Sequence, residues 1–391
     1  MFVKMSKLNV HETGLLPVYL DCNATSPLEP AVRDVLIHFL TQDFGNEGSR
    51  THEYGARAKR AVQDARDKIA AVVRANREDV VFTSGATESN NLAILGLRPY
   101  ALESGKRHII TSAVEHKAVL EPCEALERDG FTVTRLPVSK MGCVDPEELR
   151  EALRPDTVLV TIMQANNETG VRQPLEAICD LLREHPAFFH TDAAQGFGKD
   201  IEVLQDPRLD LISISAHKIY GPKGVGALIN RRRGYSRPPL HPVMYGGGQE
   251  RKLRPGTLPV APIAALGLAA ELSLRDHVER RTICQRMKGS ALRAFASLNP
   301  QITGDPSLVM DHVLNIAFPG LDSEALMVGL KDLIAVSNGS ACTSSSYEPS
   351  HVLRAMGMRD EDANRCVRIS WCHLTPSVDW DAVAARIRLL S

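Results

Sequence analysis

Lys218 is the residue of this chain whose position is best suited to covalent chemistry. It ends the apolar segment 211–218, and a turn rich in glycine and proline follows it at residues 219–226. A lysine at the end of a buried strand, beside small residues, can lose its proton and act as an amine nucleophile. A single lysine in a turn is more often an ordinary surface residue, so the neighbouring motifs decide between the two interpretations.

Two motifs upstream of Lys218 favour the chemical interpretation. Asp192 ends a second short apolar segment, where its carboxylate could hold a proton on a ring nitrogen or could cap a helix. In the segment 80–92 a strand pattern stops at Ser84 and Gly85, and the first amides of the helix that follows could bind a phosphate. The alternative is a simple helix cap on Ser84 or Thr87. A phosphate loop, an acid and a lysine in this order indicate a site for pyridoxal 5'-phosphate (PLP).

Two further residues have chemistry that would suit such a site. Cys342 follows an apolar segment and lies among glycine, serine, alanine and threonine at residues 339–346. No bulky neighbour would bury its thiol, and a reactive thiol needs access; without the PLP motifs, an incidental loop cysteine would be the favoured interpretation. Arg368 interrupts the apolar segment 367–370. Strand arginines usually lie on a solvated face, but beside a PLP site this one could bind a substrate carboxylate through two hydrogen bonds.

The composition argues against several classes of protein. The 391 residues include 46 basic and 47 acidic side chains, for a net charge of −1, which argues against nucleic-acid binding or a membrane surface as the main task. The basic run 231–233 is expected to be a solvated turn. No segment approaches the roughly 20 apolar residues of a membrane span, and residues 1–9 show no signal peptide.

The eight cysteines are scattered without CxxC spacing, which predicts a reducing, cytoplasmic location. The thirteen histidines also form no metal-binding pattern. No metal site is expected in the chain itself, although the sequence leaves open whether Cys342 binds a cluster shared within a complex.

Alternating helix and strand patterns between residues 30 and 274 predict a large α/β domain that binds the cofactor. Seven strands are expected at residues 80–83, 108–112, 131–137, 158–163, 188–192, 211–215 and 226–229. Several are continuous apolar runs, typical of a mainly parallel sheet covered on both faces. Catalytic residues should therefore lie at the carboxyl edge of this sheet.

The pattern changes after residue 274 and predicts a smaller α+β domain, formed by residues 275–391 together with residues 1–29. A long amphipathic helix is expected at 280–298, strands at 313–318, 333–336 and 367–370, and helices at 349–356 and 379–390. This domain would carry the loop that contains Cys342.

Six segments of the chain resemble the cysteine desulfurases, of the class V aminotransferase-like PLP family, in the group with a long mobile cysteine loop. These segments are Thr83–Asn90, Val114–Val119, Asn166–Gly170, His190–Gln195, Ser215–Lys218 and Gly339–Ser344. The resemblance extends from Val18 to the strand that contains Arg368. It implies the PLP-dependent transferase fold of the aspartate aminotransferase type, with a mainly parallel seven-stranded sheet and a smaller α+β domain.

The resemblance also implies a role for each residue of these motifs. Lys218 would hold the cofactor as a Schiff base, His116 would stack on its ring and move protons, and Cys342 would be the nucleophile. Asp192 would pair with the ring nitrogen, and Gln195 would hydrogen-bond the phenolic oxygen.

Further contacts are implied at the phosphate and at the substrate. The residues that would hold the phosphate are Ala86, Thr87, Ser215 and His217, with Thr257 supplied by the neighbouring subunit of a homodimer. Asn167 would contact the cofactor and, together with Arg368, the substrate carboxylate.

The activity implied is that of a cysteine desulfurase, a sulfur transferase. It would remove sulfur from L-cysteine, release L-alanine and leave a persulfide on Cys342 for an acceptor protein, either a scaffold or a thiolation enzyme. Iron–sulfur cluster assembly, tRNA thiolation and DNA phosphorothioation all remain open as destinations of the sulfur. The alternatives are an aminotransferase or a selenocysteine lyase of the same fold and, from a different class, a sulfur-carrier or scaffold protein.

Two departures from the family pattern are visible in the sequence. Cys22 and Asn23 occupy positions where small or aromatic residues are more usual, and Pro255 replaces a small polar residue. Neither departure is expected to touch the chemistry.

Overall fold

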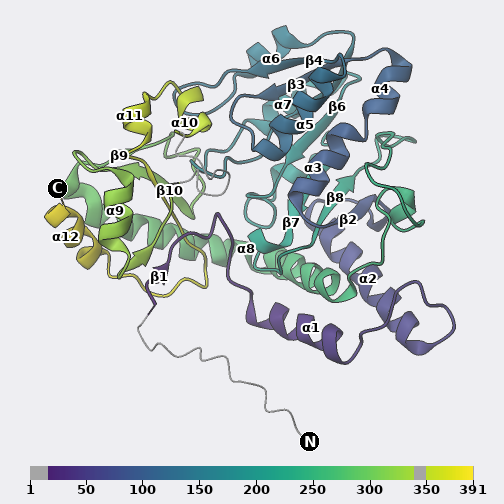
Figure 1. Ribbon diagram of the computed structural model, residues 1–391, viewed down its shortest axis with the longest axis horizontal. Helices are drawn as coiled ribbons and strands as arrows, with labels where there is room; N and C mark the ends of the chain where they lie inside the picture. Colours follow the sequence, from purple (N-terminus) through teal and green to yellow (C-terminus); the bar gives the residue numbers. More distant parts are fainter. Residues whose placement is uncertain (1–15, 339–348, 391) are drawn as a thin grey trace, which may run out of the picture.

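The computed structural model describes residues 16–338 and 349–390. A seven-stranded sheet forms its centre, with the strand order β2-β8-β7-β6-β5-β3-β4 (Figure 1). These strands are β2 (Val80–Thr83), β3 (His108–Ser112), β4 (Thr132–Leu136), β5 (Thr157–Thr161), β6 (Phe188–Asp192), β7 (Leu211–Ser215) and β8 (Gly226–Asn230). All neighbouring strands pair in parallel except β8, which runs antiparallel to both β2 and β7. The predicted seven-stranded, mainly parallel sheet is confirmed.

Helices cover both faces of this sheet and also pack in the smaller domain (Figure 1). They are α1 (Pro30–Thr41), α2 (Glu53–Val72), α3 (Ala86–Leu95), α4 (Arg98–Ser104), α5 (Lys117–Arg128), α6 (Pro146–Ala152), α7 (Leu175–Leu181), α8 (Val260–Phe295), α9 (Ser323–Leu330), α10 (His351–Ala355), α11 (Asp360–Ala363) and α12 (Trp380–Leu390). The two longest, α2 and α8, pack very closely, because a Cβ atom on Gly267 would lie 2.6 Å from the Cα of Ala65. None of the described helices combines the length and the apolar character that a membrane crossing requires.

The side chains of the central strands alternate between two buried faces. In β2, Val80 and Phe82 belong to the core formed with α2 and α8, whereas Val81 belongs to the core formed with α3 and α5. In β7, Ile212 belongs to the core formed with α2 and α8, and Leu211 belongs to the core formed with α3 and α5. Because both faces are buried, neither set of alternating positions is polar, which explains the continuous apolar runs in the sequence.

Two small sheets lie in the smaller domain. Strands β9 (Gln301–Ile302), β10 (Val313–Ala317) and β12 (Val367–Ser370) form an antiparallel sheet in the order β12-β10-β9, and β1 (Val18–Tyr19) pairs in parallel with β11 (Ile334–Ala335). Trp371, Trp380 and Phe295 pack in the core beneath them. The pairing of β1 with β11 brings the N-terminal end of the described chain to this domain.

Helix α8 is longer than the sequence pattern predicts. The expected helix began at residue 280, but α8 begins at Val260 and ends at Phe295, and a short 3-10 turn continues to Leu298. Its first half packs against α1 and α2 and is buried on most sides, so it lacks the amphipathic period that marks the second half. The division of the chain at residue 274 falls inside this continuous helix and stays a prediction.

The basic run 231–233 is only in part the solvated turn that was expected, because Arg232 is exposed whereas Arg231 is buried. Arg231 is buried, and its guanidinium donates to the carbonyl oxygens of Val73 at 2.6 Å, Leu204 at 3.0 Å and Leu209 at 3.1 Å. The arginine thus satisfies carbonyl groups at the ends of three separate segments. The charge of Arg231 therefore serves the fold.

A buried histidine links three strands of the central sheet through hydroxyl groups. His190 in β6 contacts Oγ1 of Thr161 in β5 at 2.8 Å and Oγ of Ser213 in β7 at 2.9 Å. Burial lowers the pKa of His190 to about 4, although the nearby Asp192 acts in the opposite direction. The imidazole is therefore neutral in the folded protein at neutral pH.

We expect mild acid to destabilise the fold through His190. The pKa is about 6.5 in an unfolded chain, so the unfolded state binds more protons than the folded state as the pH falls from about 6.5 towards 4. This difference costs about 1–2 kcal/mol of stability at pH 5. In thermal melts between pH 6.5 and pH 5, His190→Gln should flatten the fall in Tm, whereas His241→Gln, at an exposed site, should not. An equal fall in wild type and His190→Gln would contradict this assignment.

Candidate active site

A cavity of about 520 Å³ opens at the carboxyl edge of the central sheet, where β6 and β7 end and α3 begins. Ten of the residues predicted for cofactor or substrate line it: Ala86, Thr87, His116, Asn167, Asp192, Gln195, Ser215, His217, Lys218 and Arg368. Thr257 is exposed and does not line this cavity. Cys342 lies outside the described residues. Within residues 16–338 and 349–390, no group of three histidine, cysteine or acidic side chains is arranged to hold a metal ion.

The amine of Lys218 points to the turn that follows β1. A 3-10 turn, Ala216–Lys218, continues directly from β7, and Nζ of Lys218 donates to the carbonyl oxygens of Asn23 and, at 3.0 Å, of Ala24. The carbonyl of Asn23 also accepts a hydrogen bond from Nε2 of Gln195 at 3.0 Å. Asn23 therefore lies beside the predicted lysine through its backbone carbonyl, a group that every residue type has and that leaves no side-chain signal in the sequence.

Asp192 is held in one orientation at the end of β6. Its Oδ2 accepts from Nδ2 of Asn90 at 2.7 Å, and its Oδ1 accepts from the backbone amide of Ala194 at 2.9 Å. The carboxylate is 5% exposed and lines the cavity. Asn90 lies on the buried face of α3. In the sequence, an asparagine one turn into a helix did not indicate a functional site.

We expect Asp192→Asn to lower kcat by about 100-fold or more, because a neutral amide cannot stabilise a cation that the carboxylate would stabilise. The Ala194 amide can still donate to the new Oδ1, and Asn90 can turn its amide so that its Oδ1 accepts from the new Nδ2, so the fold and cofactor uptake should survive. Steady-state kinetics and a cofactor spectrum would measure both effects. Asp129→Asn, at a surface ion pair, serves as the control, and wild-type kcat in Asp192→Asn would remove the assigned role.

The start of α3 forms the anion-binding end of the cavity. Gly85 precedes the helix with φ 155° and ψ −179°, and a Cβ atom there would lie 3.4 Å from Oγ of Ser215. That distance is an ordinary contact, so it is the φ value that favours glycine at this position. The exposed amides and the dipole of α3 suit a phosphate. Glu88 accepts from the amide of Ser84 at 2.7 Å and pairs with Arg254 at 2.8 Å, which fixes the loop.

Two histidines on the cavity wall are neutral. Burial, reinforced by the charge of Lys218, lowers the pKa of His217 to about 4. Burial also lowers the pKa of His116, whose Nδ1 accepts from the amide of Ala118 at 3.0 Å. The neutral ring of His116 therefore carries its proton on Nε2. This ring can stack on an aromatic cofactor without adding a charge.

Arg368 is buried, although arginines in strands usually lie on a solvated face. It is 1% exposed, donates to the Asn167 carbonyl at 2.9 Å, and pairs with Oδ1 of Asp21 at 2.6 Å. Ser337 Oγ also accepts from it at 2.9 Å. This rigid guanidinium lines the cavity beside Asn167, in a position to receive a carboxylate.

The chemical groups around this cavity match those that PLP requires. Lys218 supplies an amine, Asp192 a carboxylate, and the α3 N-terminus an anion site. Four buried polar atoms of the cavity-lining residues have no hydrogen-bond partner within residues 16–338 and 349–390: Asn23 Oδ1, Asn90 Oδ1, Gln195 Oε1 and Arg368 Nε. Unpartnered buried polar atoms are costly unless a ligand or water meets them.

The fold and this site define a family. The Aminotransferase class-V family model matches residues 18–383, and the chain belongs to this family. Cysteine desulfurase IscS of Vibrio campbellii is 46% identical over 377 residues, which cover 96% of this chain and 92% of the relative. Within the family, the chain is a cysteine desulfurase.

Solved structures agree with this assignment. DndA from Streptomyces lividans is 48% identical with a TM-score of 0.80, and the match covers 88% of this chain and 97% of that one. A structure titled as SspA in complex with cysteine is 37% identical with a TM-score of 0.79, and the match covers 90% of this chain and 98% of that one.

Proposed function

We propose that this cysteine desulfurase binds PLP in the cavity at the sheet edge and takes sulfur from L-cysteine, leaving L-alanine. The observation that carries the proposal is the meeting of Lys218, Asp192 and the start of α3 around one cavity. These three features come from separate elements of the chain, and each suits a different part of the same cofactor.

The bound cofactor would supply an electron sink that stabilises negative charge at the substrate Cα. Asp192 would hold a proton on the cofactor ring nitrogen, in the orientation that Asn90 and the Ala194 amide fix. Lys218 would take the proton from Cα, for which its amine must be neutral. Two carbonyl acceptors at Asn23 and Ala24 keep this amine directed into the cavity between proton transfers.

The substrate carboxylate would bind at Arg368 and Asn167. Arg368 cannot swing away, because the Asn167 carbonyl, Ser337 and Asp21 hold its guanidinium. Its Nε–H has no partner in the part of the chain that the structure describes, and it would donate to the carboxylate. A related protein, SspA, has been crystallised with cysteine, which supports the same substrate class for this chain.

Cys342 would receive the sulfur as a persulfide, an assignment that rests on its sequence motif alone. The persulfide would then pass to an acceptor protein for iron–sulfur cluster assembly, tRNA thiolation or DNA phosphorothioation. The relatives named above do not distinguish these destinations. A cytoplasmic location likewise remains a prediction from the scattered cysteines.

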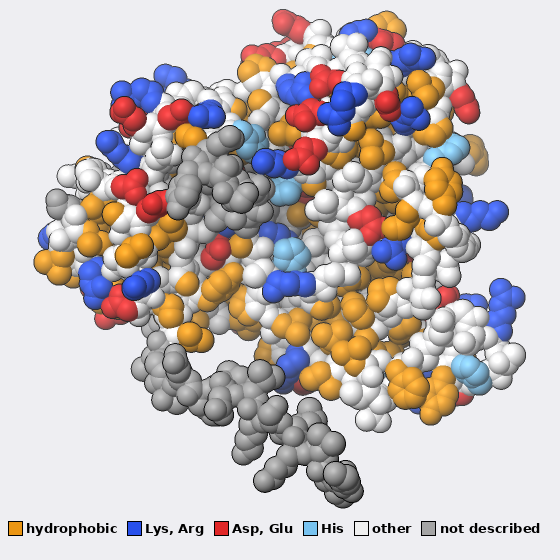
Figure 2. Space-filling model, in the orientation of Figure 1, with side chains coloured by type: hydrophobic (Ala, Val, Ile, Leu, Met, Phe, Trp, Pro, Cys, Tyr) orange, Lys and Arg blue, Asp and Glu red, His pale blue; other side chains and the backbone are white. Residues whose placement is uncertain are grey.

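A homodimer would complete the site. Thr257 is exposed on this subunit, as a residue that reaches a neighbouring cavity must be. Apolar side chains gather at the end of the molecule formed by α1 and α2 (Figure 2), where Ile37, Leu40, Phe44 and Tyr54 are each at least half exposed. Such a patch suits a subunit interface, and light scattering on the purified protein would measure the dimer directly.

Product analysis tests the proposed reaction. The purified protein, loaded with PLP, is incubated with sulfur-labelled L-cysteine, and amino-acid and keto-acid products are measured. Alanine together with labelled sulfur on the protein supports the proposal. 3-Mercaptopyruvate without protein-bound sulfur would favour the aminotransferase alternative, because transamination leaves the Cβ–S bond of cysteine intact. No spectral change on adding cysteine would favour a scaffold role.

A further inference from the structure

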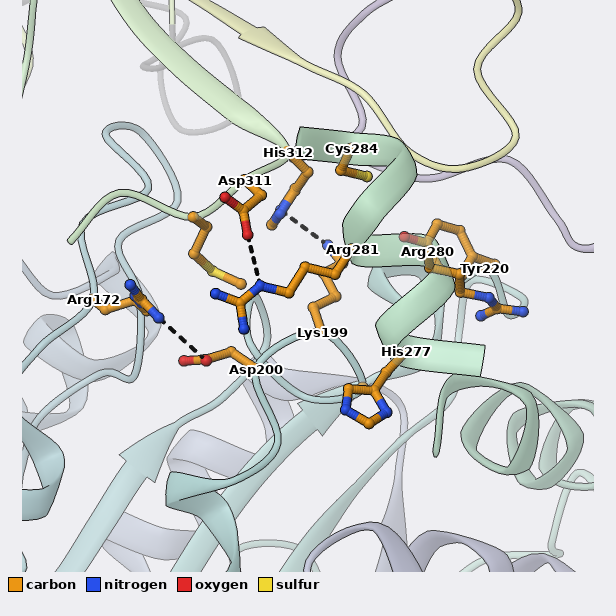
Figure 3. A pocket seen from close by; sticks show the side chains of 12 residues that line it. Arg172, Lys199, Asp200, Tyr220, His277, Arg280, Arg281, Cys284, Asp311 and His312 are labelled. Carbon is orange, nitrogen blue, oxygen red and sulfur yellow. Dashed lines mark hydrogen bonds and ion pairs between the residues drawn. The ribbon is translucent and has the colours of Figure 1, made fainter. Parts of the chain in front are cut away.

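A second cluster of reactive side chains lies away from the cofactor cavity, between the loop after β6 and helix α8 (Figure 3). Nζ of Lys199 and Nε2 of His312 point towards each other across a small cavity and are 3.3 Å apart. Tyr220 and Cys284 also line this cavity. Burial holds the pKa of His312 well below its usual value, so His312 accepts the hydrogen bond and Lys199 donates it.

Two thiols meet directly beside this cavity. Cys22 and Cys372 form a small buried cluster with Tyr220, and each cysteine is only 1% exposed. The interaction between the two thiols is the largest influence on the pKa of each. The backbone keeps them together, because the amide of Cys22 donates to the carbonyl of Ser370 at 3.1 Å, two residues before Cys372.

The two thiols are electrostatically different. The interaction with Cys22 lowers the pKa of Cys372, and Thr375 and Lys199 act in the same direction against the effect of burial. The same interaction and burial raise the pKa of Cys22. Cys372 therefore has thiolate character and Cys22 remains a protonated donor, the division of roles that disulfide formation requires.

Other buried thiols lack this arrangement. Burial raises the pKa of Cys123, Cys179 and Cys284 to about 12 in each case. A thiol that stays protonated reacts slowly with oxidants. The pairing of a thiolate with a second thiol, near a lysine, distinguishes Cys22 and Cys372 from ordinary core cysteines.

We propose that Cys22 and Cys372 form a redox-active dithiol that small hydroperoxides close to a disulfide. The Cys372 thiolate attacks one peroxide oxygen, the O–O bond breaks, and an alcohol or water leaves with a proton. The Cys22 sulfur then attacks the sulfenic sulfur of Cys372, the S–O bond breaks, and water leaves with the Cys22 proton. In total, two thiols are oxidised by two electrons and one hydroperoxide is reduced.

Closing this disulfide would alter the cofactor site. A disulfide fixes the separation and orientation of the two Cβ atoms, so closing it would restrain the backbone at Cys22. The next residue, Asn23, provides the carbonyl that accepts from both Lys218 and Gln195. Oxidation would therefore disturb the amine of Lys218, and this consequence alone rests on the proposed function.

Peptide mapping tests the dithiol without any need for turnover. The full-length protein is treated with hydrogen peroxide under native conditions, quenched, alkylated in denaturant, and digested without reductant. We expect a linked pair of peptides containing Cys22 and Cys372, the loss of two hydrogen atoms from the intact mass, and reversal by a dithiol reductant. Cys284→Ser, which changes the thiol that lines the adjacent cavity, should still give the link.

Cys22→Ser should abolish the link and leave Cys372 as a sulfenic or further oxidised acid. The proposal is wrong if wild-type Cys22 and Cys372 are both recovered as free thiols in a large excess of peroxide, or if Cys372 pairs with Cys284 instead. The cofactor band provides a separate measurement. A linked peptide without a change in this band would support the redox-active dithiol but contradict its proposed effect on Lys218.

Discussion

Replacing Lys218 with alanine should lower kcat by about four orders of magnitude or more, because the variant loses both the covalent attachment of the cofactor and the base that moves the Cα proton. The cavity should keep its shape, since the substitution removes the side chain beyond Cβ and leaves in place the backbone of Asn23 and Ala24, whose carbonyl groups accept from the amine. PLP should still bind at the α3 end, but reduction with borohydride should no longer fix it to the protein. Mass spectrometry of the reduced protein and a kinetic assay with L-cysteine would measure both losses.

Lys140 provides a matched control, because it is an exposed lysine to which no role in the site is assigned. Lys140→Ala should retain wild-type kcat and borohydride labelling. Covalent labelling of Lys218→Ala at the wild-type level, or turnover within tenfold of wild type, would show that another amine holds the cofactor.

Replacing Cys342 with alanine should separate the two halves of the reaction. Binding of the cofactor and of L-cysteine depends on the cavity residues, so the variant should keep the cofactor band and its change on adding cysteine. With no thiolate to attack the substrate sulfur, persulfide on the protein should be undetectable. Trapping the protein-bound sulfur with an alkylating agent, followed by peptide mapping, would measure this loss.

Cys143→Ala is the control for this variant, because Cys143 is partly exposed but does not line the cavity. It should form persulfide at the wild-type rate. Sulfide release from L-cysteine by Cys342→Ala at the wild-type rate would mean that a different thiol, or none, accepts the sulfur.

The strands of the large sheet could be predicted from sequence because both of their faces are buried. In residues 211–215, apolar side chains point to both faces of the sheet, and only the serines are polar. Such a pattern is typical of a strand that is covered on both faces. The start of α8 could not be predicted in this way, because a helix that is buried on most sides loses its period. Arg231 was misjudged for a related reason, since a charged side chain can be buried where several carbonyl groups accept from it.

The candidate site was predictable where a side chain at a strand end carries the chemistry, as at Asp192 and Lys218. Parallel strands bring such ends to one edge whatever their separation in sequence. Asn23 and Asn90 were not predicted as site residues, because each contributes to the site only through a contact with a residue far along the chain. Asn23 contacts Lys218, and Asn90 contacts Asp192. Pairwise contacts of this kind leave no trace in local spacing.

The turn that holds the Lys218 amine is itself anchored by the last strand of the fold. The amide of Asn23 donates to Oγ of Ser370 at 2.9 Å, and Ser370 ends β12. A polypeptide emerging from the ribosome would therefore lack this anchor until nearly all of it had been translated. Prematurely terminated products could fold much of the central sheet and still be unable to fix the amine, so the cell would not accumulate truncated but active enzyme.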